Sequence, residues 1–172
     1  MVNQARVNRT PGDCGVDDLV YRVPDGWALE AALAEGRPTA AVFVPQACSA
    51  SGFVTTLLVD HAEVPASASV ESILAAGDAH LRSADAEVAQ VWHRTAMIGE
   101  GPAAAKLSVV RTAAWPTPVL QLRAVIDRGA TERARRIVTV VLTCDAEDGE
   151  RFVPDAISLL EGLAVQDAVS ES

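Results

Sequence analysis

The side chains that could do acid–base or nucleophilic chemistry are few in this sequence, and their spacing does not assemble them into a site. Asp60 and His61 are neighbours on a segment that alternates like a β-strand, so their side chains point to opposite faces and cannot form a dyad directly. His80 comes three residues before Ser83, but no nucleophile motif surrounds this serine. The sequence also lacks the G-x-S-x-G, H-E-x-x-H and glycine-rich phosphate-loop motifs. We therefore predict that the protein is not an enzyme and has no catalytic residues.

The three cysteines do not predict a metal centre. Cys14, Cys48 and Cys144 show neither CxxC spacing nor a nearby histidine pattern of the kind that closes a zinc tetrahedron. Cys144 ends an apolar segment, where a free thiol typically behaves as a small buried hydrophobe. Cys14 and Cys48 flank turn-rich segments and could pair with each other. We expect no metal and no cofactor.

Arginine and tryptophan side chains suit this chain better for binding than for catalysis. Six of them are the candidate binding residues: Trp92, Arg94, Arg111, Trp115, Arg123 and Arg136. If strand register brings Arg111, Arg123 and Arg136 onto one face, they form a cationic stripe suited to a partner that carries carboxylates. The alternative is a solvated outer face on which the arginines pair with Asp127, Glu132 and nearby acids.

Length and charge limit the classes of partner. The chain has 172 residues, enough for one domain with its own core, and 49% of them are hydrophobic while 22% are charged. A net charge of −9 repels phosphate backbones and anionic lipids, so we expect no nucleic-acid partner and no membrane insertion. The N-terminal residues lack the apolar run of a secretory signal, and Cys14 is not preceded by a lipobox. We expect a cytoplasmic protein.

The N-terminal half of the sequence predicts short strands between turns. We expect a loose arm over residues 1–17, which are polar and rich in turn-forming residues. Predicted strands cover Leu19–Val23, Ala40–Val44 and Phe53–Glu63. Ala28–Glu35 fits a strand or a helical turn, and its periodicity does not decide. Trp27 follows a Pro-Asp-Gly turn, where a tryptophan more often covers one end of the core than stacks on a ligand.

An amphipathic helix follows these strands. Its apolar stripe runs from Val70 to Leu81 at intervals of three and four residues. Ser67 or Ser69 could cap its N-terminus. The strict capping box is absent, because a serine, Ser72, stands three residues after Ser69 in place of a glutamate or glutamine.

The C-terminal half predicts longer strands closed by a helix. These strands are Glu87–Ile98, Ala104–Trp115, Val119–Asp127 and Ile137–Cys144. The last helix covers Phe152–Leu163, with Pro154 in its first turn, where no amide donor is missed. We therefore predict a single α+β domain over residues 18–167, with a central antiparallel sheet flanked by helices, and a frayed tail over residues 168–172.

Three sequence segments carry a resemblance to a known fold. They are YRVPDGW near the start, GPAAAKLSVVR in the middle and VTVVLTCDAEDGERFVPDAISLLEGLAV near the end. Over residues 19–166 the chain resembles the fold shared by PsbP, the Ran-binding Mog proteins and, above all, the mycobacterial LpqN-type proteins; it is also similar to the Eag chaperones that accompany secreted effectors. The resemblance implies an α/β/α sandwich used for binding other proteins or as an accessory module. Positive charge is almost all arginine, with Lys106 the only lysine, a bias that resembles proteins of GC-rich actinobacteria.

Two functions of different classes remain. The favoured one is a non-enzymatic, protein-binding accessory or chaperone-like module, with secretion as one setting and homodimer formation allowed, which uses an exposed sheet face or a groove beside Trp92 and Trp115. The alternative is a small-molecule-binding or cyclase-like domain, with a pocket between the sheet and its helices that contains His93 or Arg94. A deep apolar cavity would favour the alternative, whereas a solid core beside a flat apolar patch would favour protein binding.

Overall fold

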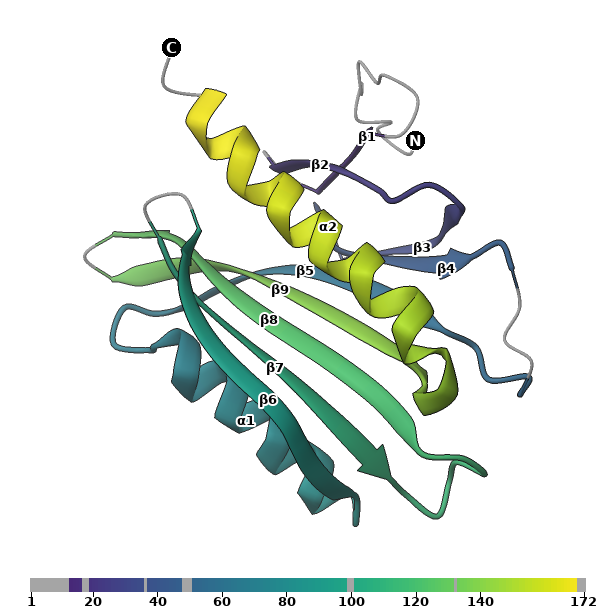
Figure 1. Cartoon of the computed structure of the whole chain (residues 1–172). Helices are drawn as coiled ribbons and strands as arrows, with labels where there is room; N and C mark the ends of the chain where they lie inside the picture. Colours follow the sequence, from purple (N-terminus) through teal and green to yellow (C-terminus); the bar gives the residue numbers. More distant parts are fainter. Residues whose placement is uncertain are drawn as a thin grey trace.

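The described part of the chain forms a seven-stranded antiparallel sheet, two α-helices and a separate two-stranded hairpin (Figure 1). The computed structural model describes residues 13–16, 19–35, 37–47, 51–98, 101–131 and 133–169. The pairing of Cys14 with Cys48, which the sequence left open, involves a residue outside the described ones, because Cys48 is not among them. The division into an N-terminal arm and a domain over residues 18–167 stays a prediction.

The last strand of the chain lies in the middle of the large sheet. The hairpin consists of β1 (Asp13–Val16) and β2 (Leu19–Arg22). The large sheet consists of β3 (Trp27–Glu35), β4 (Arg37–Pro45), β5 (Thr56–Pro65), β6 (Glu87–Ile98), β7 (Gly101–Arg111), β8 (Val119–Ala130) and β9 (Ala134–Asp145). The helices are α1 (Val70–Ser83) and α2 (Gly149–Val169), the latter preceded by the short 3-10 helix η1 (Ala146–Asp148). The order β3-β4-β5-β9-β8-β7-β6 leaves β3 and β6 at the two edges.

Most predicted strands and both helices are confirmed. The segment Ala28–Glu35, for which the sequence left strand and helical turn open, is a strand within β3, although its alanines, leucines and glutamates favour helix by intrinsic propensity. Pairing with β4 overrides this preference. β1 lies inside the segment that the sequence predicted as a loose arm. α2 begins at Gly149, earlier than predicted, so Pro154 stands inside the helix and not in its first turn.

One face of the sheet packs against α2 and carries the main core. The buried cluster on this side, which we call the α2-face core, contains Trp27, Ala41, Phe43, Leu57, Val59, Ala103, Leu107, Leu122, Ala124, Ile126, Val138, Val140, Leu142, Cys144, Phe152, Ala156, Leu159, Leu160 and Leu163. Trp27 meets the ring of Phe152 edge-on, with centroids 5.6 Å apart, and its indole N–H donates to Asp155 Oδ2 at 2.8 Å. The prediction that Trp27 covers one end of the core is therefore confirmed.

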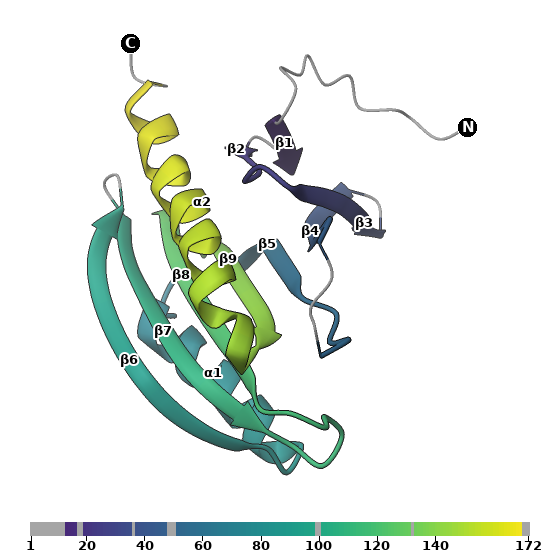
Figure 2. The same ribbon diagram turned by 45° about the vertical axis from the view of Figure 1, so that its right-hand side comes forward.

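The opposite face packs against α1 over a smaller apolar area. Among the described residues its buried cluster contains Val70, Leu74, Ala104, Val125 and Ile137. Figure 2 shows the sheet curving around α2 with α1 on the other side. The two faces follow from strand alternation, because successive residues of β8 and β9 contribute to different clusters.

The N-terminus of α1 is closed by two serines. Ser69 is the N-cap, and its hydroxyl accepts from the Ser72 amide at 3.1 Å. The Ser72 hydroxyl accepts in turn from the Ser69 amide at 3.0 Å. The strict motif with glutamate or glutamine is absent from the sequence, but the Ser72 side chain completes a capping box in its place by reaching the N-cap amide.

Candidate protein-binding edge at β6

β6 is an exposed edge strand with apolar side chains. Within the described part of the chain it pairs with β7 alone, so the backbone groups on its outer side have no strand partner there. Val91 and Met97 are 55% and 64% exposed. The register with β7 shifts between Gln90 and Trp92, which makes Val91 the extra residue of a β-bulge. A row of unpaired backbone donors and acceptors is a template for another strand.

Two predicted binding residues meet on the α2 side of this strand. Trp92 is half-buried against the α2-face core and pairs with Leu107. The Arg94 guanidinium lies over the Trp92 ring, 5.8 Å from its centroid. Arg94 is exposed, and no carboxylate in the described part of the chain forms an ion pair with it. The tryptophan holds the arginine by a cation–π contact and leaves its N–H groups available.

The other side of β6 is fixed to α1. His93 Nε2 lies 3.1 Å from Glu71 Oε2, and their side chains are 34% and 48% exposed. β6 is therefore held through Trp92 on one side and through His93 on the other. An edge strand fixed from both sides is already ordered before a partner arrives, which lowers the entropy cost of binding.

The predicted cationic stripe does not form, because the register separates its members. Arg123 lies directly across from Val141, whereas Arg136 is five residues from Val141 along β9 and so points to the opposite face. Arg111 ends β7 across from Glu87, at the other end of the sheet from Arg136. These three arginines therefore do not share one surface.

Arg123 is half-buried under α1. Its guanidinium donates to Gln121 Oε1 at 3.1 Å and occupies the space that a Cβ at Gly77 would need. Burial lowers the pKa of Arg123, and the Asp78 carboxylate partly offsets this. Asp78 also forms an ion pair with Lys106. Arg123 thus has a structural role at the α1 interface.

The alternative prediction, that the arginines pair with Asp127, Glu132 and nearby acids, is supported at Arg135 among the described residues, whereas Glu132 lies outside them. Arg135 Nη1 lies 2.5 Å from Asp127 Oδ2. Asp127 is only 6% exposed and also accepts from the Gly129 amide at 2.9 Å. This ion pair was not among the predicted binding residues, and it closes the turn between the two strands.

Trp92 and Trp115 do not border one groove. Trp115 packs edge-on against Phe53, with ring centroids 6.1 Å apart, beside the buried residues Ala86, Val110 and Val119. Trp92 belongs with the α2-face core instead. The predicted groove is therefore wrong, and only Trp92 contributes to the β6 edge.

The side chains with reactive chemistry lie apart. Asp60 pairs with Thr139 and His61 with Val138, so the two point to opposite faces as predicted. Burial raises the pKa of Asp60. Burial, with Asp148 and Asp145 adding to it, raises the pKa of Cys144 to about 12, so its thiol stays protonated at neutral pH and is a poor nucleophile. The described residues contain no group of three or more histidine, cysteine or acidic side chains placed to hold a metal.

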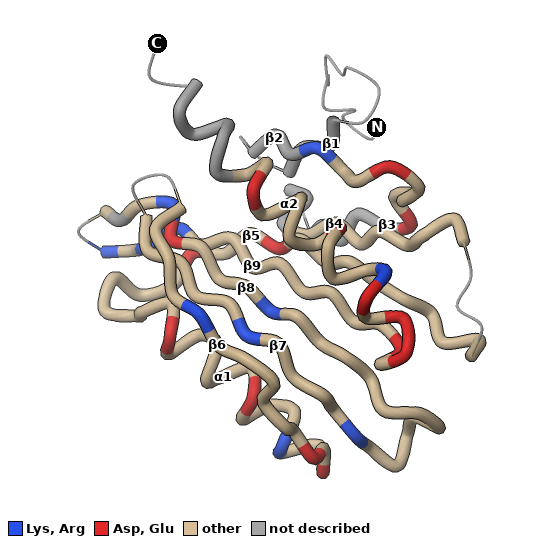
Figure 3. The backbone as a smooth tube through the Cα atoms, viewed as in Figure 1, with Lys and Arg blue, Asp and Glu red and all other residues tan. Residues whose placement is uncertain are grey.

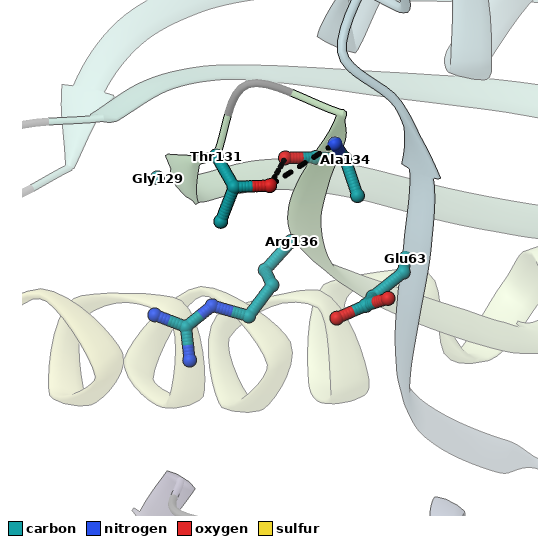
Figure 4. A pocket seen from close by; sticks show the side chains of 5 residues that line it. All are labelled: Glu63, Gly129, Thr131, Ala134 and Arg136. Carbon is teal, nitrogen blue, oxygen red and sulfur yellow. Dashed lines mark hydrogen bonds between the residues drawn. The ribbon is translucent and has the colours of Figure 1, made fainter.

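A hollow of about 310 Å³ lies at the β8–β9 turn beside β5 (Figure 4). Its lining consists of Glu63, Gly129, Thr131, Ala134 and Arg136. The Thr131 hydroxyl donates to the Ala134 carbonyl at 3.0 Å and accepts from the Ala134 amide at 3.1 Å. His93 and Arg94, which the small-molecule prediction placed inside a pocket, do not line this hollow.

Comparison with known proteins identifies the fold. No family model and no curated protein matches the chain. Among solved structures it is similar to LpqN of Mycobacterium tuberculosis, involved in cell envelope biogenesis, with a TM-score of 0.62 and 10% identity over 82% of this chain and 78% of that one. Cyanobacterial PsbP (CyanoP) of Synechocystis sp. PCC 6803 gives a TM-score of 0.55 and 10% identity over 83% and 84%. The Ran-binding protein Mog1p of Saccharomyces cerevisiae gives 0.50 and 14% over 88% and 87%.

These matches define the fold of the chain. The chain has the PsbP/Mog-like fold that the sequence segments predicted, with LpqN among its structural neighbours. Identities of 10 to 14% support the fold and no more. None of the described helices is both long and apolar enough to span a membrane.

Proposed function

We propose that this protein is a non-enzymatic accessory module that binds another protein, and that the outer edge of β6 is its binding surface. The observation that carries the proposal is the exposed strand itself, with Val91 and Met97 in solvent and the Arg94 guanidinium held over Trp92. Tryptophan, arginine and methionine are enriched at protein interfaces, and tryptophan and arginine dominate their binding energy. A chaperone-like role in secretion is one form that such binding could take, in the cytoplasmic setting expected from the sequence.

The fold supports this proposal without specifying a partner. Mog1p is a Ran-binding protein, so the same fold carries a protein-binding surface in at least one neighbour. One helix packs against each face of the sheet, which supports the predicted α/β/α arrangement. Under α2 the core is filled by large buried side chains such as Phe43, Phe152 and Leu159.

The small-molecule alternative has weaker support. It required a deep apolar cavity between the sheet and a helix, with His93 or Arg94 inside. The hollow at the β8–β9 turn has polar lining residues, including Glu63 and Arg136, and its volume is near the lower limit for ligand pockets. Large buried side chains under α2, beside an edge strand that exposes Val91 and Met97, favour protein binding.

Affinity capture with matched variants tests the proposal. The tagged wild-type chain and the variants Val91→Lys, Met97→Lys and Val54→Lys are each incubated with lysate of the source organism, and captured proteins are quantified by mass spectrometry. Val54 is the control, because it is 69% exposed and apolar but lies outside β6. We expect the same protein to be captured by wild type and Val54→Lys and to be lost from the two β6 variants, with melting temperatures unchanged.

Two results would contradict the proposal. Capture that survives both β6 substitutions would place the binding surface elsewhere. Co-purification of a single metabolite, with no protein that depends on β6, would support the small-molecule alternative instead.

A further inference from the structure

We infer that the partner adds to the β6 edge as an extended strand and carries a carboxylate that binds Arg94. This inference rests on the proposed function, and it names the chemistry of the partner segment. It follows from the regularity of the edge, from the charge of Arg94 and from the sizes of the side chains around it.

The regular part of the edge begins after the bulge. From Trp92 to Ile98, seven consecutive residues pair in unbroken register with Leu107 to Gly101 of β7. Such a segment presents evenly alternating backbone donors and acceptors along its outer side. Another extended strand can satisfy them, whereas a helix, whose backbone groups are already bonded, cannot.

The opposite edge of the sheet is a poorer template. β3 shows two register shifts within its nine residues, between Leu29 and Ala31 and between Leu33 and Ala34. β-bulges twist an edge and interrupt its row of backbone groups, which protects it against pairing. Of the two edges of the large sheet, β6 therefore offers the longer uninterrupted run.

The charge of Arg94 selects the partner. The chain carries a net charge of −9, so acidic segments are repelled by most of its surface and need a local cation to be held. Arg94 is such a cation, because it is exposed and forms no ion pair within the described residues. Stacking on Trp92 restricts the guanidinium while its planar fork can still bind a carboxylate through two hydrogen bonds.

The side chains beside Arg94 indicate which residues flank the acidic residue in the partner strand. On the α2 side of β6, Trp92 precedes Arg94 by two residues and Ala96 follows it by two. Ala96 pairs with Ala103, so two small side chains lie side by side and leave room for a larger apolar one. A matching strand therefore has an acidic residue with apolar residues two positions before and two after it.

Selection from a random 12-residue peptide display library on the full chain tests this inference. We expect enriched peptides with the pattern apolar-x-acidic-x-apolar, which protect the amides of residues 92–98 from hydrogen exchange. Arg94→Glu should weaken them about ten- to a hundredfold, as expected for loss of a charge-assisted pair. Peptides with the acidic residue replaced by arginine should recover binding to Arg94→Glu. N-methylation at alternate peptide residues should abolish binding.

Arg111→Glu is the matched control, because Arg111 is also exposed and without an ion pair in the described residues but ends β7. It should change affinity less than threefold. Peptides that protect β6 but show no acidic preference and no response to Arg94→Glu would overturn the inference and leave the proposed function standing. Peptides that protect other elements, or no enrichment at all, would count against both.

Discussion

The two faces of the sheet hold their helices by different means. Beneath α2 the described residues form a continuous apolar core, with Phe152, Leu159 and Leu163 each 1 to 2% exposed. Beneath α1 the buried apolar cluster of the described residues is smaller, and ionisable side chains contact one another beside it. Figure 3 shows lysine and arginine positions along β6, β7 and β8 and acidic positions on α1. The Lys106–Asp78 ion pair and the His93–Glu71 side-chain contact connect these elements.

The two faces therefore contribute differently. We expect the α2 face mainly to stabilise the fold and the α1 face mainly to fix the position of its helix. Burial of apolar area is the dominant favourable contribution to folding, so the α2 face should carry most of the stability. Ion pairs contribute little net energy but favour one relative position of the groups that form them. The α1 face therefore sets where the helix lies on β6, β7 and β8. Because His93 belongs to β6, it also fixes the candidate binding edge.

The largest expected effect compares one leucine from each helix. Leu159→Ala on α2 should lower the free energy of unfolding by about 4 kcal/mol, and Leu74→Ala on α1 by about 2 to 3 kcal/mol, since the cost rises where the surroundings cannot collapse. Leu159 and Leu74 are 1% and 3% exposed, so the substitutions are matched in burial. Urea denaturation measures both. Equal losses of unfolding free energy in the two variants would contradict the proposed difference between the two faces.

The next effect concerns the ion pair under α1. Asp78→Asn should destabilise the protein by about 1 to 3 kcal/mol, because it leaves Lys106, whose side chain is only 12% exposed, without its anion. The double variant Asp78→Leu/Lys106→Met should recover part of this loss, because Lys106 is then not left unpaired, whereas Arg123 still loses the nearby carboxylate. Chemical denaturation of both variants checks this. If the double variant is less stable than Asp78→Asn, the ion pair contributes more to stability than the desolvation of its two charges costs.

The pH dependence of stability tests the burial of the Cys144 thiol on the α2 face. The pKa of Cys144 is raised from 9.0 to about 12 in the folded protein, so above pH 9 the thiol ionises in the unfolded chain first and favours unfolding. Stability should fall by about 1.4 kcal/mol per pH unit between these values. Unfolding at pH 8 and pH 10 should show this decrease in wild type but not in Cys144→Ala. An equal decrease in stability in wild type and Cys144→Ala would show that other titrating groups cause it.

The smallest effect concerns Gly77. In a helix interior, glycine to alanine normally stabilises by about 1 kcal/mol. Here the Arg123 guanidinium occupies the place of the new Cβ, so Gly77→Ala must displace it and should gain nothing. In an Arg123→Ala background the same substitution should stabilise by about 1 kcal/mol. A double-mutant cycle measures the coupling, and additive effects would show that Arg123 moves away without cost.

Local pattern predicted much of the fold and part of the candidate site. Ile137–Cys144 and Phe152–Leu163 follow from period-2 and period-3.6 patterns, and the structure places β9 and α2 there. Trp92 and Arg94 were named from residue type alone and do meet on β6. Their shared position follows from a spacing of two residues on one strand, which is a local relation.

The relations between distant residues could not be predicted in this way. The arginine stripe failed because the register of β8 and β9 decides which face each side chain takes, and one residue of offset reverses it. The Ser69–Ser72 box was missed because its geometry, and not its residue type, decides whether the hydrogen bonds form.

The sequence by itself determined the elements, because strand and helix patterns depend on neighbours a few residues apart. Only the tertiary structure decided that β9, last in the chain, pairs between β5 and β8, and that β6 is therefore left at the edge. The same long-range pairing placed Lys106 and Arg123 under α1 and left Arg94 exposed on the edge strand. Which arginine is structural and which can bind a partner depends on contacts between strands far apart in the chain, which no local pattern records.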